Sequence, residues 1–205
     1  NEFLKIININ KESDMNYLDI LNDKYIGLSI VIYNFRRKYV DLVNKYIDGI
    51  FSSITGLEGL KMIYTSNVSN LDNDTFKDKL KSNLSREIQY KITFIGPNRD
   101  DFYFDLNGKN LSLYGSNGQI RSAVLALKLA EVKLFTDVLS DTPILLLDDI
   151  FSELDIDKRN KVIKYLDNDI QTIVTTTDIE NIDKNVRNKA NVYKIENGKI
   201  ISREI

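Results

Sequence analysis

Short apolar runs that alternate with helical segments constrain the fold of this chain most. Residues 144–147 (ILLL) and residues 172–177 (TIVTTT) have the length of buried strands and are too short for helices. Residues 157–168, which lie between them, have a helical pattern. Strands that alternate with helices indicate an α/β layer with antiparallel edges, and each run is apolar enough to be buried on both faces. The sequence therefore predicts an α/β fold, a mixed sheet flanked by helices.

Further strands and helices are expected before this pair. Residues 60–64 and 91–96 (KITFIG) are predicted to be strands, and residues 74–89 an amphipathic helix. Apolar and polar residues alternate over residues 102–114, on both sides of an Asn-Gly pair. That pattern predicts a β-hairpin in which both arms are strands.

Two Asn-Gly pairs mark the expected antiparallel hairpins. Asn107-Gly108 is the first, and Asn197-Gly198, within residues 191–205, is the second. Asn-Gly is favoured in two-residue hairpin turns because both positions need a positive φ. These hairpins would form the antiparallel edges of the sheet.

A long helical segment precedes the α/β part. Residues 14–53 carry apolar residues at the 3-4 spacing of a coiled coil, with Ser13 as a candidate N-cap and Gly27 as a candidate kink or break. About 40 helical residues would reach about 60 Å, so we expect an arm that projects or pairs with helices outside the chain. We therefore predict a helical arm at 1–56 and a head lobe at 57–205. The seam residues are Leu18, Leu21, Tyr25, Leu28, Ile32, Phe35, Tyr39, Leu42 and Tyr46.

Composition limits the chemistry that is available. The 205 residues include no cysteine and no histidine, which excludes disulfides, thiol nucleophiles, imidazole bases and the usual zinc ligands. The net charge is −2, so any contact with nucleic acid needs a local basic patch. No run of 18 apolar residues is present, and we expect a soluble, cytoplasmic protein without a membrane partner. The opening at Asn1 suggests that the chain begins within a longer protein.

Adjacent carboxylates follow the run at residues 144–147. Asp148 and Asp149 would lie at the carboxyl end of a strand, where α/β sheets bind ligands. Mg²⁺ is typically held by one or two carboxylates together with substrate phosphates, and a second carboxylate can accept a proton from an attacking water. The alternative is an Asp pair that only closes a loop and faces water.

The stretch GSNGQ, residues 115–119, opens a predicted helix. Ser116 and Gln119 have the spacing of a capping box, which needs neither Gly115 nor Gly118. Glycines allow a ligand to approach the backbone closely, and a helix N-terminus offers N–H groups to an anion. A cap alone and a cap combined with a phosphate site both remain possible from these residues.

The order of these motifs resembles that of a known family. GSNGQ resembles the signature motif of ABC-type ATPases, LLLDD at 145–149 their Walker B strand, and SELD at 152–155 their D-loop. More narrowly, three stretches resemble the RecF family of the SMC/Rad50-like branch: GPNRDDFYFDLNG at 96–108, YGSNGQIRSAVLALKLAE at 114–131 and LLLDDIFSELD at 145–155. The resemblance covers about residues 91–178. The sequence departs from that family at Asn98, where histidine is usual, and at Asn117, where glutamine is usual.

No Walker A spacing, G-x-x-x-x-G-K, is present. We therefore expect the phosphate-cradling loop to lie N-terminal to Asn1, which makes the chain the C-terminal part of a RecF-like protein. Residues 98–101 (NRDD) have no assigned role. The simplest alternative for them is a turn in which Arg99 pairs with an aspartate.

The resemblance implies a dimer that sandwiches two ATP molecules. Each site would use the Walker motifs of one subunit and the signature of the other. The signature residues would then meet the γ-phosphate of the ATP bound to the partner. They are Ser116, Asn117, Gly118 and Gln119.

Further roles follow from the same resemblance. Asp148 would hold Mg²⁺, and Asp149 would stand at the position of the catalytic carboxylate. Asp155 would cross the dimer interface as part of the D-loop. Thr177 would stand where transporters have a γ-phosphate-sensing histidine, and a hydroxyl there is consistent with slow hydrolysis.

The family binds single-stranded and gapped duplex DNA and works with RecR and RecO to load RecA, so the resemblance implies DNA repair and replication. The candidate DNA-contacting residues are two basic clusters that are otherwise ordinary solvated faces. The first is Arg36, Arg37 and Lys38 on the arm, and the second is Lys77, Lys79, Lys81 and Arg86.

Other classes fit the sequence less well or leave the activity open. A transporter nucleotide-binding subunit would carry the missing histidine, an Asp-Glu pair and no heptad arm. The head of another SMC/Rad50-like ATPase remains an alternative, as does a non-catalytic interaction fragment. The complete protein is expected to be a slow ATPase, and this part alone is expected to be inactive.

Overall fold

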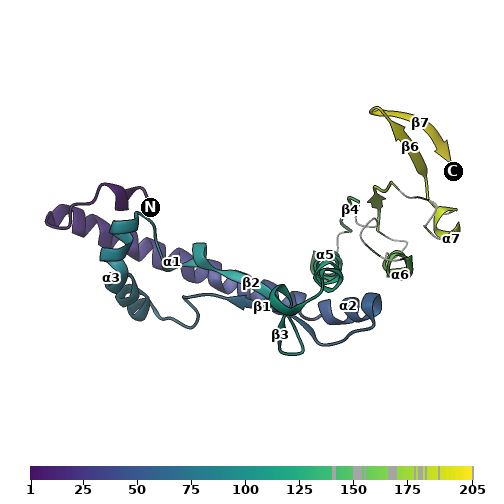
Figure 1. Ribbon diagram of the computed structural model, residues 1–205. Coiled ribbons are helices and arrows are strands. Elements are labelled where there is room, and N and C mark those ends of the chain that lie inside the picture. The colour runs from purple at the N-terminus through teal and green to yellow at the C-terminus, as the bar shows by residue number, and fades with distance from the viewer. Residues whose placement is uncertain are drawn as a thin grey trace. The chain divides into compact units, whose positions relative to one another are not determined.

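The computed structural model describes residues 1–139, 142–149, 154, 156–165, 170–177, 179, 182, 184–188 and 190–204 (Figure 1). The chain divides into two compact units. The first consists of Asn1–Lys45 and Lys61–Asp105, and the second of Tyr46–Leu60 and Leu106–Ile205. These boundaries differ from a division between residues 56 and 57. The division into a helical arm at 1–56 and a head lobe at 57–205 stays a prediction.

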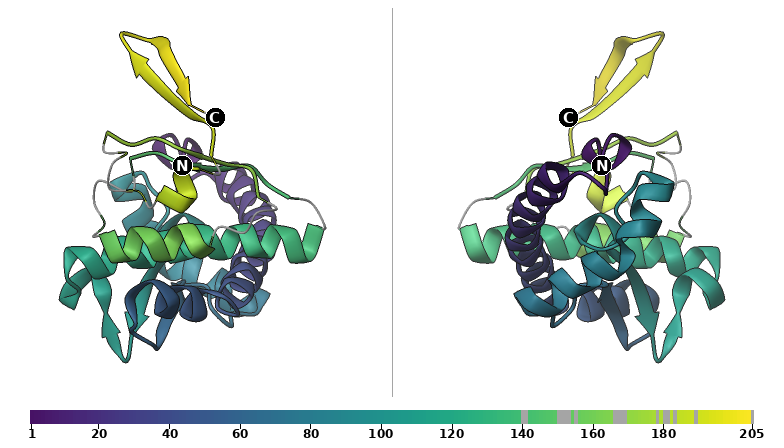
Figure 2. Two further views of the ribbon diagram at one scale, coloured as in Figure 1. Left: turned by 90° about the vertical axis from the view of Figure 1, so that its right-hand side faces the viewer. Right: turned by 90° about the vertical axis from the view of Figure 1, so that its left-hand side faces the viewer.

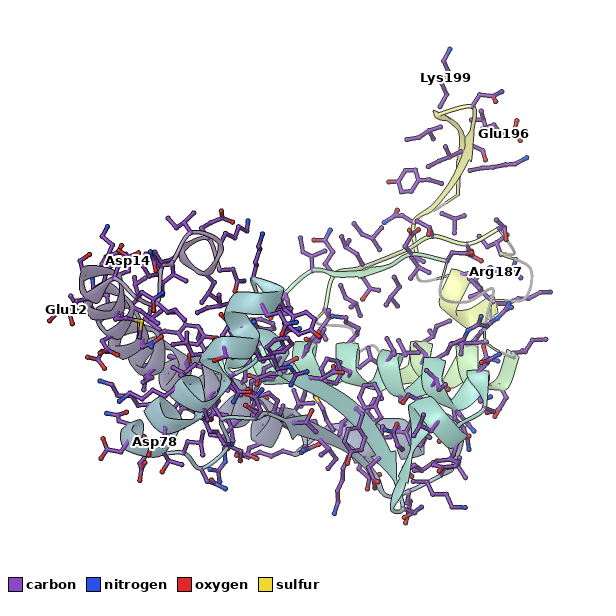
Figure 3. All side chains as sticks on the ribbon, turned by 60° about the vertical axis from the view of Figure 1, so that its left-hand side comes forward. Glu12, Asp14, Asp78, Arg187, Glu196 and Lys199 are labelled. Carbon is purple, nitrogen blue, oxygen red and sulfur yellow. The ribbon has the colours of Figure 1, made fainter. Side chains whose placement is uncertain are left out.

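A long helix and a shorter one form the core of the first unit. Figures 1 and 2 show α3 packed alongside α1, and between them lie Ile26, Phe76 and Leu80, each at most 4% exposed. Acidic Glu12 and Asp14 lie in the first turn of α1, where they favour the helix dipole (Figure 3). The elements are η1 (Phe3–Lys5), α1 (Glu12–Val43), β1 (Leu60–Thr65), α3 (Asn73–Tyr90), η2 (Pro97–Arg99) and β2 (Asp101–Leu106).

The predicted long helix exists but ends earlier than expected. α1 begins at Glu12, so the prediction of Ser13 as N-cap is wrong, and it runs unbroken through Gly27. The break comes at Asn44, whose side chain donates to Met62 O at 2.9 Å and accepts from Met62 N at 2.8 Å. This amide clamp ties the helix end to β1, so α1 is fixed to its own unit at this point.

The predicted heptad seam is only partly buried. Leu18 is 7% exposed, and Tyr25 packs against the α1–α3 core. Leu28 and Phe35, by contrast, are 65% and 72% exposed. The helix therefore packs on α3 through a face that includes Ile26, which is not a seam position.

The predicted strand at residues 91–96 is wrong. Main-chain donors there bind side chains: Phe94 N donates to Glu87 Oε1 at 2.6 Å, and Gly96 N donates to Asn67 Oδ1 at 2.9 Å. Gly96 has φ +120°, which a strand does not allow. Because side chains satisfy these backbone groups, the apolar segment forms a folded loop.

The second unit contains the predicted α/β elements together with three helices that were not predicted there, α2 (Ile47–Thr55), α4 (Leu111–Tyr114) and α7 (Lys184–Arg187). The other elements are β3 (Lys109–Asn110), α5 (Asn117–Leu139), β4 (Leu145–Leu147), α6 (Ile156–Tyr165), β5 (Thr172–Val174), β6 (Val192–Glu196) and β7 (Lys199–Glu204). α2 packs against α5 and α6 and is almost fully buried at Ile47, Phe51 and Ile54. None of the helices in the described part of the chain is long and apolar enough to cross a membrane.

The two predicted strands are present as β4 and β5, and they pair in parallel. Leu145 faces Thr172 and Leu147 faces Val174 in the register. Leu145 and Leu147 are buried, but Leu146 is 68% and Ile173 is 51% exposed. The prediction that these strands are buried on both faces is therefore wrong, because only one face of the pair is covered by the described residues.

Both Asn-Gly turns are confirmed. Asn107 and Asn197 have positive φ, and each is followed by a positive-φ glycine. β6 and β7 pair antiparallel, with Glu196 and Lys199 flanking the turn (Figure 3). The second arm of the first hairpin, however, stops at Asn110, whose side chain accepts from Ser112 N at 2.9 Å and so begins the short helix α4.

The pKa values of two tyrosines in the first unit lead us to expect a loss of stability at alkaline pH. Burial raises the pKa of Tyr25 and of Tyr64 from 10.0 to about 12. Folded chains then hold more protons than unfolded chains between these values, so the free energy of unfolding falls as pH rises through that window. Urea unfolding at about pH 9 and about pH 11 should show this fall. Tyr25→Phe with Tyr64→Phe should reduce it.

Tyr114→Phe, at an exposed position, is the matched control for this prediction. A double variant that loses as much stability between the two pH values as the Tyr114→Phe control would contradict the assignment to these phenols.

Candidate functional site

The capping box at the start of α5 is formed. Ser116 N donates to Gln119 Oε1 at 2.8 Å, and Gln119 N donates to Ser116 Oγ at 3.2 Å. This reciprocal pair satisfies two of the N–H groups that a helix N-terminus leaves without intrahelical partners. The prediction from the Ser-Gln spacing is therefore confirmed as a local structure.

The two glycines of the stretch have different causes. A Cβ on Gly115 would lie 2.6 Å from Leu111 O, so the turn between α4 and α5 requires glycine. A Cβ on Gly118 would meet nothing within 4 Å, and its φ is not positive. Packing within the described residues therefore does not explain Gly118, although glycine costs about 0.5–1 kcal/mol relative to alanine in a helix.

Two N–H groups remain for an external acceptor. The box uses the main-chain donors of Ser116 and Gln119, whereas those of Asn117 and Gly118 have no hydrogen-bond partner in the part of the chain that the structure describes. Both belong to the first turn of a 23-residue helix, where the helix dipole favours an anion. The cap and an anion can therefore share this terminus by using different donors.

Asp148 and Asp149 follow β4 at the carboxyl edge of the β4–β5 pair. Thr175, the first residue after β5, donates its hydroxyl to Asp148 Oδ1 at 2.5 Å. The same hydroxyl oxygen accepts from Asp149 N at 2.9 Å, and Asp149 has φ +48°. Sequence reasoning missed Thr175, although the positions where the two strands end would have placed it beside Asp148.

The donor set fits Mg²⁺ better than a tighter-binding metal. Among the described residues no three acidic, histidine or cysteine side chains cluster into a metal site. Both aspartates are exposed and offer hard oxygen ligands. One or two carboxylates completed by water and phosphate oxygens are the usual protein share of a Mg²⁺ site.

The contacts within the described residues do not bring the remaining predicted site residues together. Thr177 is exposed on the segment that follows β5. Asp155 lies outside the described residues. Leu154 beside it is buried, and its carbonyl accepts from Arg159 Nε at 2.8 Å. Within the described part of the second unit, no hydrogen bond joins the capping box to Asp148.

Residues 98–101 have a structural role within the first unit. Asp100 accepts from Arg36 Nη1 at 2.8 Å and from the Tyr64 hydroxyl, and its side chain is 2% exposed. Arg99 donates to Thr93 O at 3.0 Å. The expected turn exists as η2, but the arginine that pairs with an aspartate is Arg36, so the predicted pairing of Arg99 is wrong.

Several candidate DNA-binding residues already have partners. Arg36 donates to Pro97 O at 2.6 Å as well as to Asp100. Lys77 pairs with Asp23 at 2.9 Å. Arg37 and Lys38 are exposed on α1 and stay candidates.

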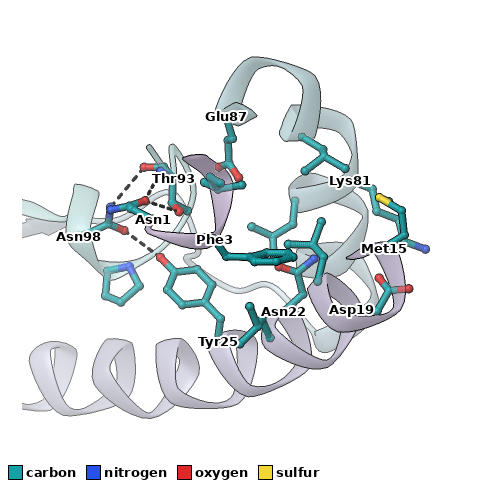
Figure 4. Close-up of a pocket in the computed structure, with 16 residues that line it drawn as sticks. Asn1, Phe3, Met15, Asp19, Asn22, Tyr25, Lys81, Glu87, Thr93 and Asn98 are labelled. Carbon is teal, nitrogen blue, oxygen red and sulfur yellow. Dashed lines mark hydrogen bonds between the residues drawn. The ribbon is translucent and has the colours of Figure 1, made fainter. Parts of the chain in front are cut away.

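A pocket of about 530 Å³ lies in the first unit and contains none of the predicted ATP-site residues. Figure 4 shows Tyr25 donating to Asn98 Oδ1 at 2.8 Å and Asn1 bonded to Thr93 at one end of it. Phe3 lies within the pocket (Figure 4). Its lining is mostly apolar and shows no phosphate-binding arrangement.

Curated relatives cover the whole chain. It is 36% identical over 213 residues to the DNA replication and repair protein RecF of Lactobacillus johnsonii, which includes 100% of this chain and 57% of that protein. It is 36% identical over 208 residues to RecF of a Geobacillus species, with 98% and 56% covered. The chain thus spans a little over half the length of these relatives. No protein-family model matches.

Solved structures with a similar fold are also RecF proteins. The recombination mediator protein RecF with ATPrS, in the RecFOR pathway, has a TM-score of 0.77 and 27% identity over 97% of this chain and 53% of that one. The corresponding RecF–ATP structure has a TM-score of 0.77 and 26% identity over 99% and 54%. The mixed α/β fold with helices and small sheets is that of this part of RecF.

Proposed function

This chain is a RecF homologue that spans a little over half of a RecF protein, and on this premise we propose that it carries the signature and metal-binding residues of a DNA-repair ATPase. The signature would act on ATP held by a second subunit. The two aspartates after β4 would act on ATP held by their own subunit. The chain would thus contribute to both faces of a composite ATP site.

The unexplained Gly118 is the observation that carries this proposal. Nothing in the described chain fills the space beside it, while the N–H groups of Asn117 and Gly118 lack partners. An anion at that point would account for the glycine, for the free donors and for a cap that leaves them free. A phosphate of ATP is the anion that the RecF–ATP relative supports.

The two carboxylates would have different roles in the site. Mg²⁺ would neutralise phosphate charge when it is bound. Asp148 offers the carboxylate for the metal, and its Oδ1 is already oriented by Thr175. Asp149 would orient the attacking water and accept its proton. Thr177 is the candidate for sensing the γ-phosphate, and Asp155 for contacting the partner subunit.

The wider setting is part of the same proposal. ATP binding would drive homodimerisation, and the dimer would bind single-stranded or gapped DNA in the cytoplasm, with RecR and RecO as partners. The solved RecF structures are described as part of the RecFOR pathway, which supports these partners. Arg37 and Lys38 are the exposed cations on α1 that stay available for phosphate contacts.

Separate substitutions of Asp148 and Asp149 test the proposed roles of the two carboxylates. In the complete protein, Asp149→Asn should keep ATP binding and slow hydrolysis by about a hundredfold or more, because an amide cannot accept the proton from water. Asp148→Ala should instead weaken the binding of ATP in the presence of Mg²⁺. Single-turnover hydrolysis and equilibrium binding of a fluorescent ATP analogue, with and without Mg²⁺, measure the two effects.

Asp157→Asn on α6 is a suitable control, because Asp157 is exposed and pairs only with Lys161 at 2.8 Å among the contacts described. It should behave as the wild type. If Asp148→Ala and Asp149→Asn change the same quantity by the same factor, the assignment of metal and water roles is wrong.

A further inference from the structure

The two carboxylates share an anchor on the neighbouring strand. Thr175 N donates to Leu147 O at 3.0 Å, which extends the β4–β5 ladder by one residue. Its hydroxyl then reaches the two residues that follow Leu147. The side chain therefore connects β5 to the segment in which the strand β4 ends.

The chemistry of this contact fixes its direction. An ionised carboxylate accepts hydrogen bonds and cannot donate, so the single hydroxyl proton goes to Asp148 Oδ1. The hydroxyl oxygen keeps lone pairs, one of which accepts from Asp149 N. Hydrogen bonds to a charged group are stronger than neutral ones.

The backbone at Asp149 needs such support. Its φ of +48° lies in the left-handed region, which a residue other than glycine adopts at a cost of about 1 kcal/mol or more. The N–H of Asp149 is held by the same hydroxyl that orients Asp148. One side chain thus sets both the carboxylate of Asp148 and the turn that places Asp149.

We propose that Thr175 is a positioning residue that fixes Asp148 for the metal and Asp149 for water. This inference rests on the proposed function and adds to it a residue that the motif resemblance does not assign. The proton of Thr175 takes one acceptor site on Oδ1, and Asp148 keeps Oδ2 for a cation. Thr177 lies two residues after Thr175 on the same segment. A shift of that segment would therefore move both carboxylates as well, through their hydrogen bonds to Thr175.

The test compares Thr175→Val with Thr175→Ser in the complete protein. Valine keeps the branched shape and the strand preference of threonine but removes the hydroxyl, whereas serine keeps the hydroxyl. Thr175→Val should raise the Mg²⁺ concentration needed for half-maximal binding of the ATP analogue by about tenfold, and lower kcat by about tenfold, the scale of one hydrogen bond to a charged group. Thr175→Ser should restore both, and ATP binding without Mg²⁺ should be unchanged in all variants.

Thr172→Val is the matched control, because Thr172 lies at the other end of β5 and donates only to Ile170 O, at 3.2 Å, among the bonds described. It should match the wild type. In an Asp148→Ala background, Thr175→Val should produce no further change in Mg²⁺ dependence, since its acceptor is gone.

A Thr175→Val variant with the Mg²⁺ dependence and kcat of the wild type would overturn the inference. So would one whose losses follow only its melting temperature and are matched by Thr175→Ser. If ATP binding to the wild-type protein does not depend on Mg²⁺, the proposed function is contradicted, and this inference is contradicted with it.

Discussion

Gly96→Ala should destabilise the chain by about 3 kcal/mol or more, which is a large share of the stability of a typical domain. Gly96 has φ +120° and ψ 179°, a conformation that is essentially confined to glycine. An added Cβ would also lie 1.9 Å from the Tyr25 hydroxyl. The cost is therefore the sum of backbone strain and a clash.

A movement of Tyr25 that relieved this clash would itself cost stability. The Tyr25 hydroxyl makes a hydrogen bond whose one proton is shared between Ile95 O and Asn98 Oδ1, each at 2.8 Å, and its ring packs against the α1–α3 core. Rotation away from Gly96 would break that bond and leave a gap in the core. Equilibrium urea unfolding, followed by circular dichroism, measures the loss.

Gly27→Ala provides the opposite result in the same unit. Gly27 lies in the middle of α1, is exposed, and would have nothing within 4 Å of a Cβ. Alanine there should stabilise the chain by about 0.5–1 kcal/mol, because glycine is a poor helix former. Equal free energies of unfolding for the two variants would show that the Gly96 loop rearranges freely.

Gly118→Leu should abolish ATP hydrolysis by the complete protein while leaving its fold intact. Leucine favours helix over glycine by up to about 1 kcal/mol, Gly118 is exposed, and a Cβ there would meet nothing within 4 Å in the described chain. The capping pair of Ser116 and Gln119 is untouched, unlike in a Ser116 variant, which would lose a cap worth about 1 kcal/mol. The added bulk matters only if another molecule must approach this turn.

The physical reason is the short range of the proposed contact. Main-chain N–H groups bind a phosphate oxygen at about 3 Å, and a leucine beside them keeps the phosphate out of reach. ATP binding to the subunit's own Walker motifs should survive. Gly49→Leu is the control, because Gly49 is also an exposed helix glycine with nothing within 4 Å of a Cβ. It should hydrolyse ATP as the wild type does.

Local rules predicted those features whose partners are close in sequence. The Ser116–Gln119 box follows from a three-residue spacing, and the turn at Asn107 follows from an Asn-Gly pair. The existence of the strands β4 and β5 follows from their apolar composition, whereas their parallel pairing is seen only in the structure. In each case the stabilising contact is either local or dictated by burial.

Features that depend on distant side chains were not predictable in this way. The segment at residues 91–96 is apolar enough for a strand, but Asn67 and Glu87 take its main-chain donors. The end of α1 depends on Asn44 meeting Met62, a pair 18 residues apart. A sequence pattern shows the polar residue and does not show which backbone it will bind.

The candidate site shows the same division. Asp148 and Asp149 were identified from their place after an apolar run, whereas Thr175 directly follows the next strand and becomes their neighbour only through the β4–β5 register. The roles of Asn98 and Asp100 likewise became apparent only once α1 lay beside them.

Sedimentation velocity of the complete protein, with and without ATP and Mg²⁺, tests the central claim that the signature turn acts on the nucleotide of a second subunit. The wild type and Gly49→Leu should sediment as monomers without nucleotide and as dimers with it. Gly118→Leu should bind ATP and remain a monomer. A Gly118→Leu protein that dimerises with ATP as fully as the wild type would show that the turn is only a helix cap, and would contradict the account.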